Sequence, residues 1–475
     1  MTITKQTLGF SLIGLIVSIG LVFFRAETLT LENALLAVAI MWVGMMPSVV
    51  FLELPKAERS PFPLMPLTGI FYAVFFGFPA FIAYYLIGSN DTRIQFYGHR
   101  YIDAISLEAQ ILVLVGIVLM FLAWVIGKRY LFKLIPAFTL PKPCEEPSLI
   151  LIAWALALSS LAYWMIPEIS SLPSIGQFLQ PAGYLAFAIF YLFYSRGRLN
   201  WVNKVAYFFM VLPAWLGCLI ASGSLTPVLL FFTLWIVLRI TFTPSVPKIV
   251  IIVPLILVLV YPYVNEFREK YWVASDQSSV ISKVIGFGSI VARGILADEV
   301  TPQTALGPLH GLVRRVSLVL PMSQVVYATP EQVTYWNGVT YQTLFTGWIP
   351  RVIWRDKPKE SWGNIFGRKF NIIAPEDKLN SINIPWITEM YANFGRSGVL
   401  VGMILVGLFL GFLDRFLNSP NRNISEQAIG ATALLPLFFQ ESNFTLMTGS
   451  LFPLILCFWL LFSIGLRIKL PWSAQ

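Results

Sequence analysis

The chain has 475 residues, of which 57% are hydrophobic, 15% aromatic and only 12% charged, and its mean hydropathy is +0.73. This composition excludes an ordinary soluble domain and indicates an integral membrane protein. The net charge of +9 does not indicate nucleic acid as a partner, because the cytoplasmic loops of any polytopic membrane protein collect Lys and Arg.

Apolar stretches long enough to cross a hydrocarbon core of ~30 Å as a helix recur along the whole chain. The first stretch could be mistaken for a signal peptide, but Arg25 and Glu27 follow it without a small-residue cleavage site, so it is expected to be retained as the first helix. The predicted fold class is all-α and polytopic, with about twelve transmembrane helices. The predicted spans are residues 8–24, 33–52, 65–87, 109–126, 148–165, 178–194, 204–221, 225–242, 248–263, 397–413, 427–443 and 446–466.

The distribution of positive charge predicts the topology and three regions. Lys and Arg gather in alternate loops, which places those loops and both termini in the cytoplasm. Helices one to nine then occupy residues 1–263, one large external loop occupies 264–396, and the last three helices with a cytoplasmic C-terminus occupy 397–475. A long loop can cross the membrane regardless of its charge, but the many cations of this one call for an anionic partner.

The cysteines and histidines indicate no metal, disulfide or cofactor. Cys144, Cys218 and Cys457 lie far apart, without a paired motif or neighbouring histidines. His310 is one of only two histidines, so it cannot belong to a multi-histidine metal site.

The first cluster of candidate site residues lies in the external loop, where Pro350 suits the start of a helical turn. Arg351 and Arg355, four residues apart, would then share one face, and two such guanidinium groups suit phosphate or diphosphate oxygens. Trp354 and Lys357 lie alongside. The alternative is a cationic amphipathic segment that rests on anionic lipid head groups.

The second cluster lies in LGPLHGLVRRVSLVLP, residues 306–321, where the apolar pattern predicts a half-buried helix. His310 and Arg314 are four residues apart on its polar edge, and Arg315 adjoins them. The cluster could bind a diphosphate or a sugar hydroxyl, and an ordinary structural role for His310 is equally open.

The third cluster, in IPWITEMYANFGRSG, enters the tenth predicted span. Glu389, Asn393 and Arg396 fall at i, i+4 and i+7 on one expected helical face just above the membrane. Polar groups at that depth are costly unless they face a cavity, which makes them functional candidates. The alternative is a structural pairing of Glu389 with Arg396. The glycines that follow are spaced for close helix packing: Gly398, Gly402, Gly407 and Gly411.

Three segments resemble the O-antigen polymerase group, the polysaccharide repeat-unit polymerases of bacterial envelopes. They are GVTYQTLFTGWIPRVIWRDKP (338–358), GNIFGRKF soon after, and PWITEMYANFGRSGVLVGMILVGLFLGFLDR (385–415). The similar elements are Gly-Thr-Tyr with Tyr341, a Pro-Arg…Trp…Lys-Pro segment, and Glu-x-Tyr-x-x-Phe-Gly with Tyr391.

The resemblance implies a glycosyltransferase of the GT-C-like fold at the outer face of the cytoplasmic membrane. It would join undecaprenyl-diphosphate-linked repeat units into a surface polysaccharide without a metal. Arg351 and Arg355 would stabilise the diphosphate leaving group, and Glu389 would be the base for the acceptor hydroxyl. The expected partners are lipid-linked oligosaccharides, the membrane, a chain-length regulator and a flippase. Substrate binding would fall to His310, Arg314, Arg315, Lys357, Tyr341, Trp354, Tyr391, Asn393 and Arg396.

One feature departs from this family. Its members often carry an arginine after a Gly-Ser pair near mid-chain, where SGSLTPVLL here has Leu225. If that arginine binds phosphate in the family, another residue must supply the charge in this chain. A polar cluster of Glu266, Arg268 and Glu269 follows the ninth predicted span, and its role stays open between a site and a solvated face.

Two other functions fit the same pattern. An O-antigen ligase would use the same donor and transfer the glycan to the lipid A core. A flippase of lipid-linked oligosaccharides would also have about a dozen spans, but it predicts charges along a path through broken helices. The predicted spans are nearly free of Lys, Asp and Glu, which favours the enzyme. A membrane cysteine protease is excluded, because the external loop contains no cysteine.

Overall fold

The computed structural model describes residues 5–24, 31–55, 58–87, 103–140, 146–242, 260, 263–264, 266–273, 279–296, 315–347, 349, 353–357, 361–378, 380–420 and 422–465. Within these ranges the chain forms helices and no strands. The elements are α1 Lys5–Phe24, α2 Leu31–Glu53, α3 Leu64–Tyr72, η2 Ala73–Gly77, α4 Phe78–Ile87, α6 Leu107–Ile126, η3 Gly127–Leu131, α7 Glu146–Met165, α8 Pro167–Ser170, α9 Gly176–Ser195, α10 Trp201–Val205, η4 Ala206–Val211, α11 Leu212–Ala221, α12 Leu225–Phe242, η5 Glu269–Val273, α14 Val280–Leu296, α16 Val319–Ala328, η6 Val339–Phe345, α17 Trp362–Lys369, α18 Trp386–Leu417, α19 Ile424–Leu434, η7 Leu435–Phe438, α20 Phe444–Thr448 and α21 Leu451–Gly465.

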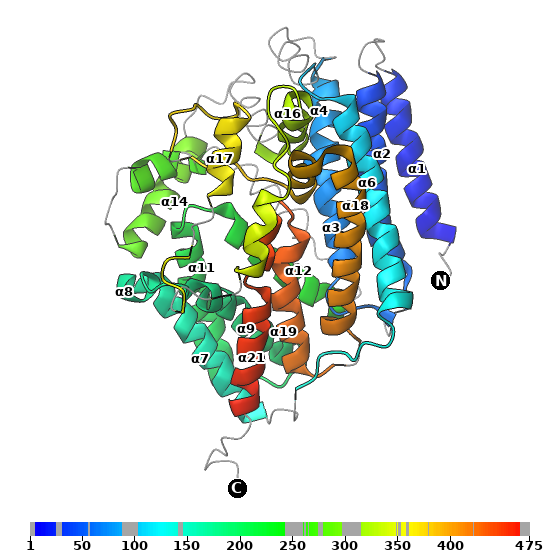
Figure 1. Cartoon of the computed structure of the whole chain (residues 1–475). Coiled ribbons are helices and arrows are strands. Elements are labelled where there is room, and N and C mark those ends of the chain that lie inside the picture. The colour runs from blue at the N-terminus through cyan, green and yellow to red at the C-terminus, as the bar shows by residue number, and fades with distance from the viewer. Residues whose placement is uncertain are drawn as a thin grey trace.

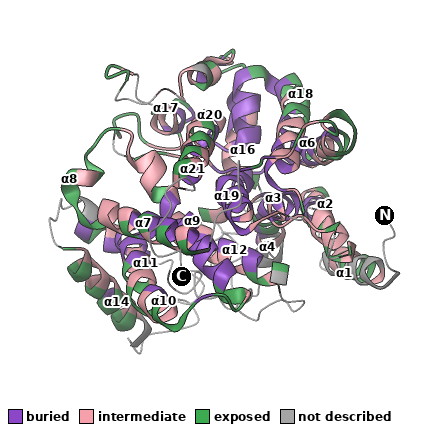
Figure 2. Ribbon diagram, turned by 90° about the horizontal axis from the view of Figure 1, so that it is seen from below, coloured by how far each residue is buried: buried purple, intermediate pink, exposed green. Residues whose placement is uncertain are grey.

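The helices pack in two groups that meet along α19, η7 and α20. In the first group α1 packs on α2, α2 on α3 and α6, and α6 on α18; in the second, α7, α9, α11, α12 and α21 pack together. The two groups lie at opposite edges of the molecule (Figure 1). The buried residues gather where α9, α16 and α19 face their neighbours, and exposed residues cover outlying helices such as α14 (Figure 2).

The protein is a helical membrane protein: eight described helices are long and apolar enough to cross a membrane. They correspond to the predicted spans 33–52, 65–87, 109–126, 148–165, 178–194, 204–221, 397–413 and 446–466. Of the other four, 8–24 forms α1 and 225–242 forms α12, while 248–263 lies almost entirely outside the described residues. The predicted span 427–443 is helical only in part, because α19 and η7 run from Ile424 to Phe438 and the helical turns end there.

Helix α18 breaks at Gly395, whose φ of 65° and ψ of −148° lie outside the helical region. Before the break, the half-helix 386–394 lies back along the following span, since a Cβ on Gly402 would lie 2.5 Å from the Met390 sulfur. In an unbroken helix two residues twelve positions apart would be about 18 Å apart. This segment therefore does not extend the span as one straight helix but is packed against it.

The glycine series packs closely, as its spacing predicted. Gly398 and Gly402 face Met390, and Gly407 and Gly411 face α6. A side chain at Gly407 would overlap the carbonyl oxygen of Met120.

Replacing Gly407 by leucine is expected to separate α18 from α6, and with it to lower the yield of folded protein after detergent extraction. The matched control is Gly14→Leu, because a Cβ at Gly14 has open space around it. Size-exclusion chromatography of the two variants checks this. Equal monodisperse yields would contradict the packing role.

Candidate functional site

A buried polar layer lies where the half-helix 386–394 meets the interruption between η7 and α20. Helix α19 and η7 contain 11 and 4 residues, so they rise about 24 Å, whereas the part of α18 after Gly395 is about 33 Å long. The interruption at 439–443 therefore lies within the depth of the membrane-spanning helices. Irregular backbone is tolerated there only where protein or a cavity surrounds it. The buried polar side chains of this layer are Thr340, Thr388, Glu389, Asn393, Gln440, Glu441, Asn443 and Thr445.

Glu389 is completely buried at the centre of this layer. Its Oε2 accepts a hydrogen bond of 2.7 Å from the N–H of Phe444, the first residue of α20. Two segments of the layer are joined through the main chain, since the Trp386 N–H donates to the Gln440 carbonyl. The hydroxyl of Tyr72 in turn donates to Gln440 Oε1 at 2.8 Å. Glu389 is thus a carboxylate held in place by a helix N-terminus.

Asn393 connects the layer to the segment 336–340. Its Nδ2 donates to Thr340 Oγ1 at 2.9 Å and to the Glu389 carbonyl at 2.8 Å, and its Oδ1 accepts from the Gly338 N–H at 2.9 Å. Every polar atom of the amide therefore has a protein partner. This geometry makes Asn393 a positioning residue that fixes η6 beside Glu389.

Tyr341 lies next to this pair at the start of η6. Its ring stacks on Phe394, with centroids 6.3 Å apart and planes 5° apart, and packs edge-on against Phe444. Its hydroxyl is buried and has no hydrogen-bond partner among the described residues. Burial, followed by the charge of Glu389, raises the pKa of Tyr341 well above its ordinary value. The hydroxyl therefore keeps its proton and can act as a hydrogen-bond donor.

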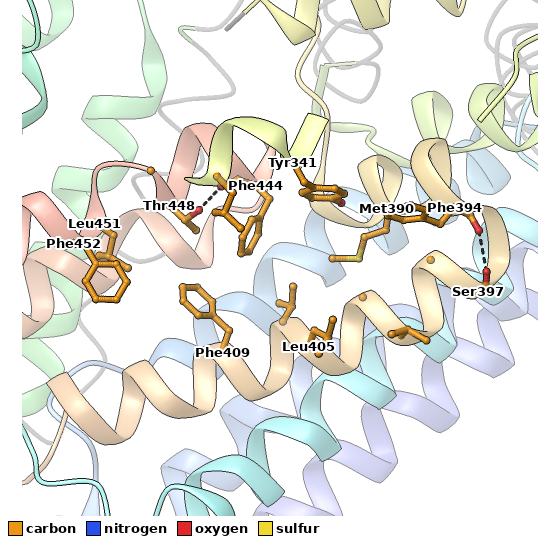
Figure 3. A pocket seen from close by; sticks show the side chains of 16 residues that line it. Tyr341, Met390, Phe394, Ser397, Leu405, Phe409, Phe444, Thr448, Leu451 and Phe452 are labelled. Atoms are coloured by element: carbon orange, nitrogen blue, oxygen red, sulfur yellow. Dashed lines mark hydrogen bonds between the residues drawn. The ribbon is translucent and has the colours of Figure 1, made fainter. Parts of the chain in front are cut away.

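An apolar groove of about 1050 Å³ runs beside the layer, between α18 and the wall formed by η6, α20 and α21 (Figure 3). We call it the α18 groove. Tyr341 and Phe444 line it, and the Phe444 N–H binds Glu389, so the carboxylate lies directly behind the groove wall. Its lining residues are Tyr341, Leu344, Met390, Phe394, Ser397, Gly398, Val401, Gly402, Leu405, Val406, Phe409, Phe444, Thr448, Gly449, Leu451 and Phe452.

Arg396 does not share a face with Glu389 and Asn393, so that prediction is wrong. The break at Gly395 turns it away, and its Nε and Nη2 bind the two carboxylate oxygens of Glu108 on α6 at 2.6 and 2.8 Å. The alternative pairing of Arg396 with Glu389 is wrong for the same reason. Tyr391 joins this second cluster, since its hydroxyl donates to Glu108 Oε1 at 3.3 Å.

The cationic segment of the predicted external loop is described at residues 353–357, which form turns and not the expected helix. The expected helical face shared by Arg351 and Arg355 is therefore not formed over these residues, and Arg351 itself lies outside the described residues. Arg355 and Trp354 are exposed. Lys357 Nζ donates to the Gly347 carbonyl at 2.7 Å, which fixes this segment to the end of η6.

Arg315 contacts the polar layer through Glu441. Its Nη1 lies 2.7 Å from Oε1 of Glu441, a carboxylate whose side chain is only 4% exposed. The predicted helix through 306–321 is interrupted, because Ser317 and Leu318 are not helical and α16 begins at Val319. His310 and Arg314 lie outside the described residues.

Arg268 contacts the turn that contains the Gly-Ser pair. Its Nε donates to the Gly223 carbonyl at 2.8 Å, two residues before Leu225. The cluster of Glu266, Arg268 and Glu269 therefore supplies a guanidinium to the junction of α11 and α12.

The sequence interpretation missed the residues Gln440, Glu441 and Asn443, because it treated 427–443 as one uniform span. The signal was present: QESN, residues 440–443, is a run of four polar residues between two apolar stretches. Such a run inside a hydrophobic segment indicates a helix break that faces protein or a cavity.

The arrangement provides a held carboxylate, a protonated phenol and an apolar groove in one place. A carboxylate and a phenol suit proton transfer and orientation of a hydroxyl or phosphate group. No three His, Cys, Asp or Glu side chains within the described ranges gather in a way that could hold a metal ion.

Comparison with known proteins gives a family without an assigned activity. Residues 65–439 match the model of a family described as a domain of unknown function, DUF8712. No curated protein and no solved structure matches the chain.

Proposed function

The chain belongs to the DUF8712 family, whose function is unknown, and we therefore propose a function from the site: transfer of a glycan from a polyprenyl-diphosphate carrier onto a second lipid-linked glycan. This reaction joins repeat units into a surface polysaccharide. One observation carries the proposal, namely that the Glu389 carboxylate lies directly behind the wall of the apolar α18 groove. A lipid-linked sugar needs both an apolar channel for its chain and polar groups for its head.

The chemistry assigns a role to each part of the site. Glu389 accepts the proton of the acceptor hydroxyl as that oxygen forms the new glycosidic bond. The bond between the donor sugar and its diphosphate breaks, and cationic groups of the external loop, among them Arg355, stabilise the charge of the departing diphosphate. Arg351, Arg314 and His310 belong to the same proposal through their positions in the sequence.

The finer topology is part of the proposal. We place about twelve spans in a bacterial cytoplasmic membrane, both termini in the cytoplasm and the segment 264–396 outside, because Lys and Arg alternate in that way. A GT-C-like arrangement, a chain-length regulator and a flippase as partners belong to the same proposal.

A second function is favoured by one observation. The breaks at Gly395 and at 439–443 are the kind of discontinuous helix that transporters place at a substrate site, so a flippase of lipid-linked oligosaccharides is the alternative. However, residues 397–413 contain no charged side chain. The polar layer is therefore not extended by charged residues along α18, as a transport path would require. This favours an enzyme at the outer face over a flippase.

Deletion of the gene, followed by gel analysis of the cell's glycans, tests the proposal. We expect single repeat units, lipid-linked or capped, in place of long polymer, and restoration by the wild-type gene. Accumulated polymer with an uncapped lipid A core would instead indicate a ligase. Substrate trapped at the cytoplasmic face would indicate a flippase, and an unchanged glycan pattern would contradict all three functions.

A further inference from the structure

The α18 groove has the shape of a channel for one extended apolar chain. Its lining along α18 runs from Ser397 to Phe409, which is about 18 Å of helix. Its volume of about 1050 Å³ lies slightly above the range for small-ligand pockets, roughly 300–1,000 Å³. We propose that this groove binds the polyisoprenoid chain of the lipid-linked substrate, an inference that rests on the proposed function for the identity of the lipid.

A second transmembrane helix is not the occupant, because the small residues that it would need are already covered. Close helix pairs use small residues spaced four apart, such as Gly398 and Gly402. In this chain Met390 covers both glycines from the half-helix 386–394: a Cβ on Gly398 would lie 2.5 Å from the Met390 carbonyl oxygen, and one on Gly402 would lie 2.5 Å from its sulfur. The remaining surface suits a flexible chain and not a rigid backbone.

The polar border of the groove complements an anionic head group. Tyr341, with its protonated hydroxyl, and Thr448 belong to the wall opposite α18. Gly449 lines the same wall, and a Cβ on Gly347 would lie 3.3 Å from the Gly449 Cα. Because Lys357 binds the Gly347 carbonyl, the cationic turn 353–357 lies beside this wall. A diphosphate attached to a chain in the groove would find hydrogen-bond donors and positive charge on one side.

Photo-labelling of the full-length protein tests the inference without any assay of activity. The purified chain, reconstituted in vesicles of phosphatidylethanolamine and phosphatidylglycerol, is labelled with geranylgeranyl diphosphate that carries a diazirine. Leu405 lines the groove and is 59% exposed, whereas Ile404, the adjacent residue of the same helix, is 38% exposed and lies outside it. We expect Leu405→Trp to reduce labelling of residues 390–409 by at least about tenfold, since the indole displaces two or more buried methylene groups of the ligand. The matched control, Ile404→Trp, should label like wild type.

Three results would overturn the inference: labelling that Leu405→Trp leaves unchanged, equal loss in Ile404→Trp, or competition by a phospholipid that is as effective as competition by unlabelled polyprenyl diphosphate. The last would show that the groove takes any membrane lipid. Failure here is distinguishable from failure of the proposed function. If Leu405→Trp labels like wild type while the gene deletion loses long polymer, the groove is not the lipid site but the proposed enzyme stands. If Leu405→Trp loses labelling while the gene deletion leaves the glycans unchanged, the groove binds a lipid but the protein is not the polymerase.

Discussion

Glu389→Gln is expected to reduce the formation of long polymer by at least about a hundredfold, the size of effect typical of a lost general base. The amide is nearly the same size as the carboxylate, and its oxygen can still accept the hydrogen bond from the Phe444 N–H. The fold should therefore survive while the negative charge and the basicity are lost. Polymer length on gels, measured in a strain that carries only the variant gene, gives the result.

The comparison with Glu389→Ala separates catalysis from positioning. Alanine removes the acceptor at the start of α20 as well as the charge, so it should lose both activity and thermal stability in detergent. Glu108→Gln is the control for loss of a carboxylate. Glu108 pairs with Arg396, whose side chain is 73% exposed, and such exposed ion pairs contribute little to the stability of the fold. Long polymer in Glu389→Gln but not in Glu389→Ala would make Glu389 a positioning residue and contradict the proposed base.

The sequence predicted the helices well where length and hydropathy decide the structure. Eight predicted spans coincide with helices of sufficient length, and the glycines at 398, 402, 407 and 411 do pack closely. These predictions depend on local properties, since a run of apolar residues must satisfy its backbone as a helix wherever it lies in a bilayer.

The site could be predicted only in part, because helical periodicity fails at a break. Asn393 lies with Glu389 as their spacing of four indicated, yet Arg396, three residues later, follows Gly395 with its φ of 65° and turns to Glu108. No local pattern contains this partner, which is 288 residues away along the chain. The same holds for Arg315, whose pairing with Glu441 depends on the interruption after η7.

Lys128→Met is expected to destabilise the protein by about 3 kcal/mol, at the lower end of the range for one broken partner of a buried ion pair. Lys128 Nζ lies 2.5 Å from Asp414 Oδ2, and the side chains of the two residues are 30% and 2% exposed. Removal of the lysine leaves the buried carboxylate with the Asn418 amide, which donates to its Oδ1. Unfolding by a denaturing detergent in mixed micelles measures the loss.

The double variant Lys128→Met with Asp414→Asn should recover much of that stability, because it leaves no buried charge without its partner. Asn418 also binds the backbone of Phe62, through its Nδ2 and Oδ1, so this network fixes the end of α18 that lies farthest from Glu389. Activity per folded molecule should therefore stay near wild type in Lys128→Met, in Asp414→Asn and in the double variant, although less protein accumulates. If the loss of stability in the double variant equals the sum of the losses in the two single variants, the two side chains are not coupled. If fully folded Lys128→Met protein makes no long polymer, this network is instead part of the functional machinery. That result would strengthen the transport alternative, because charged groups at both ends of α18 would then be needed for function.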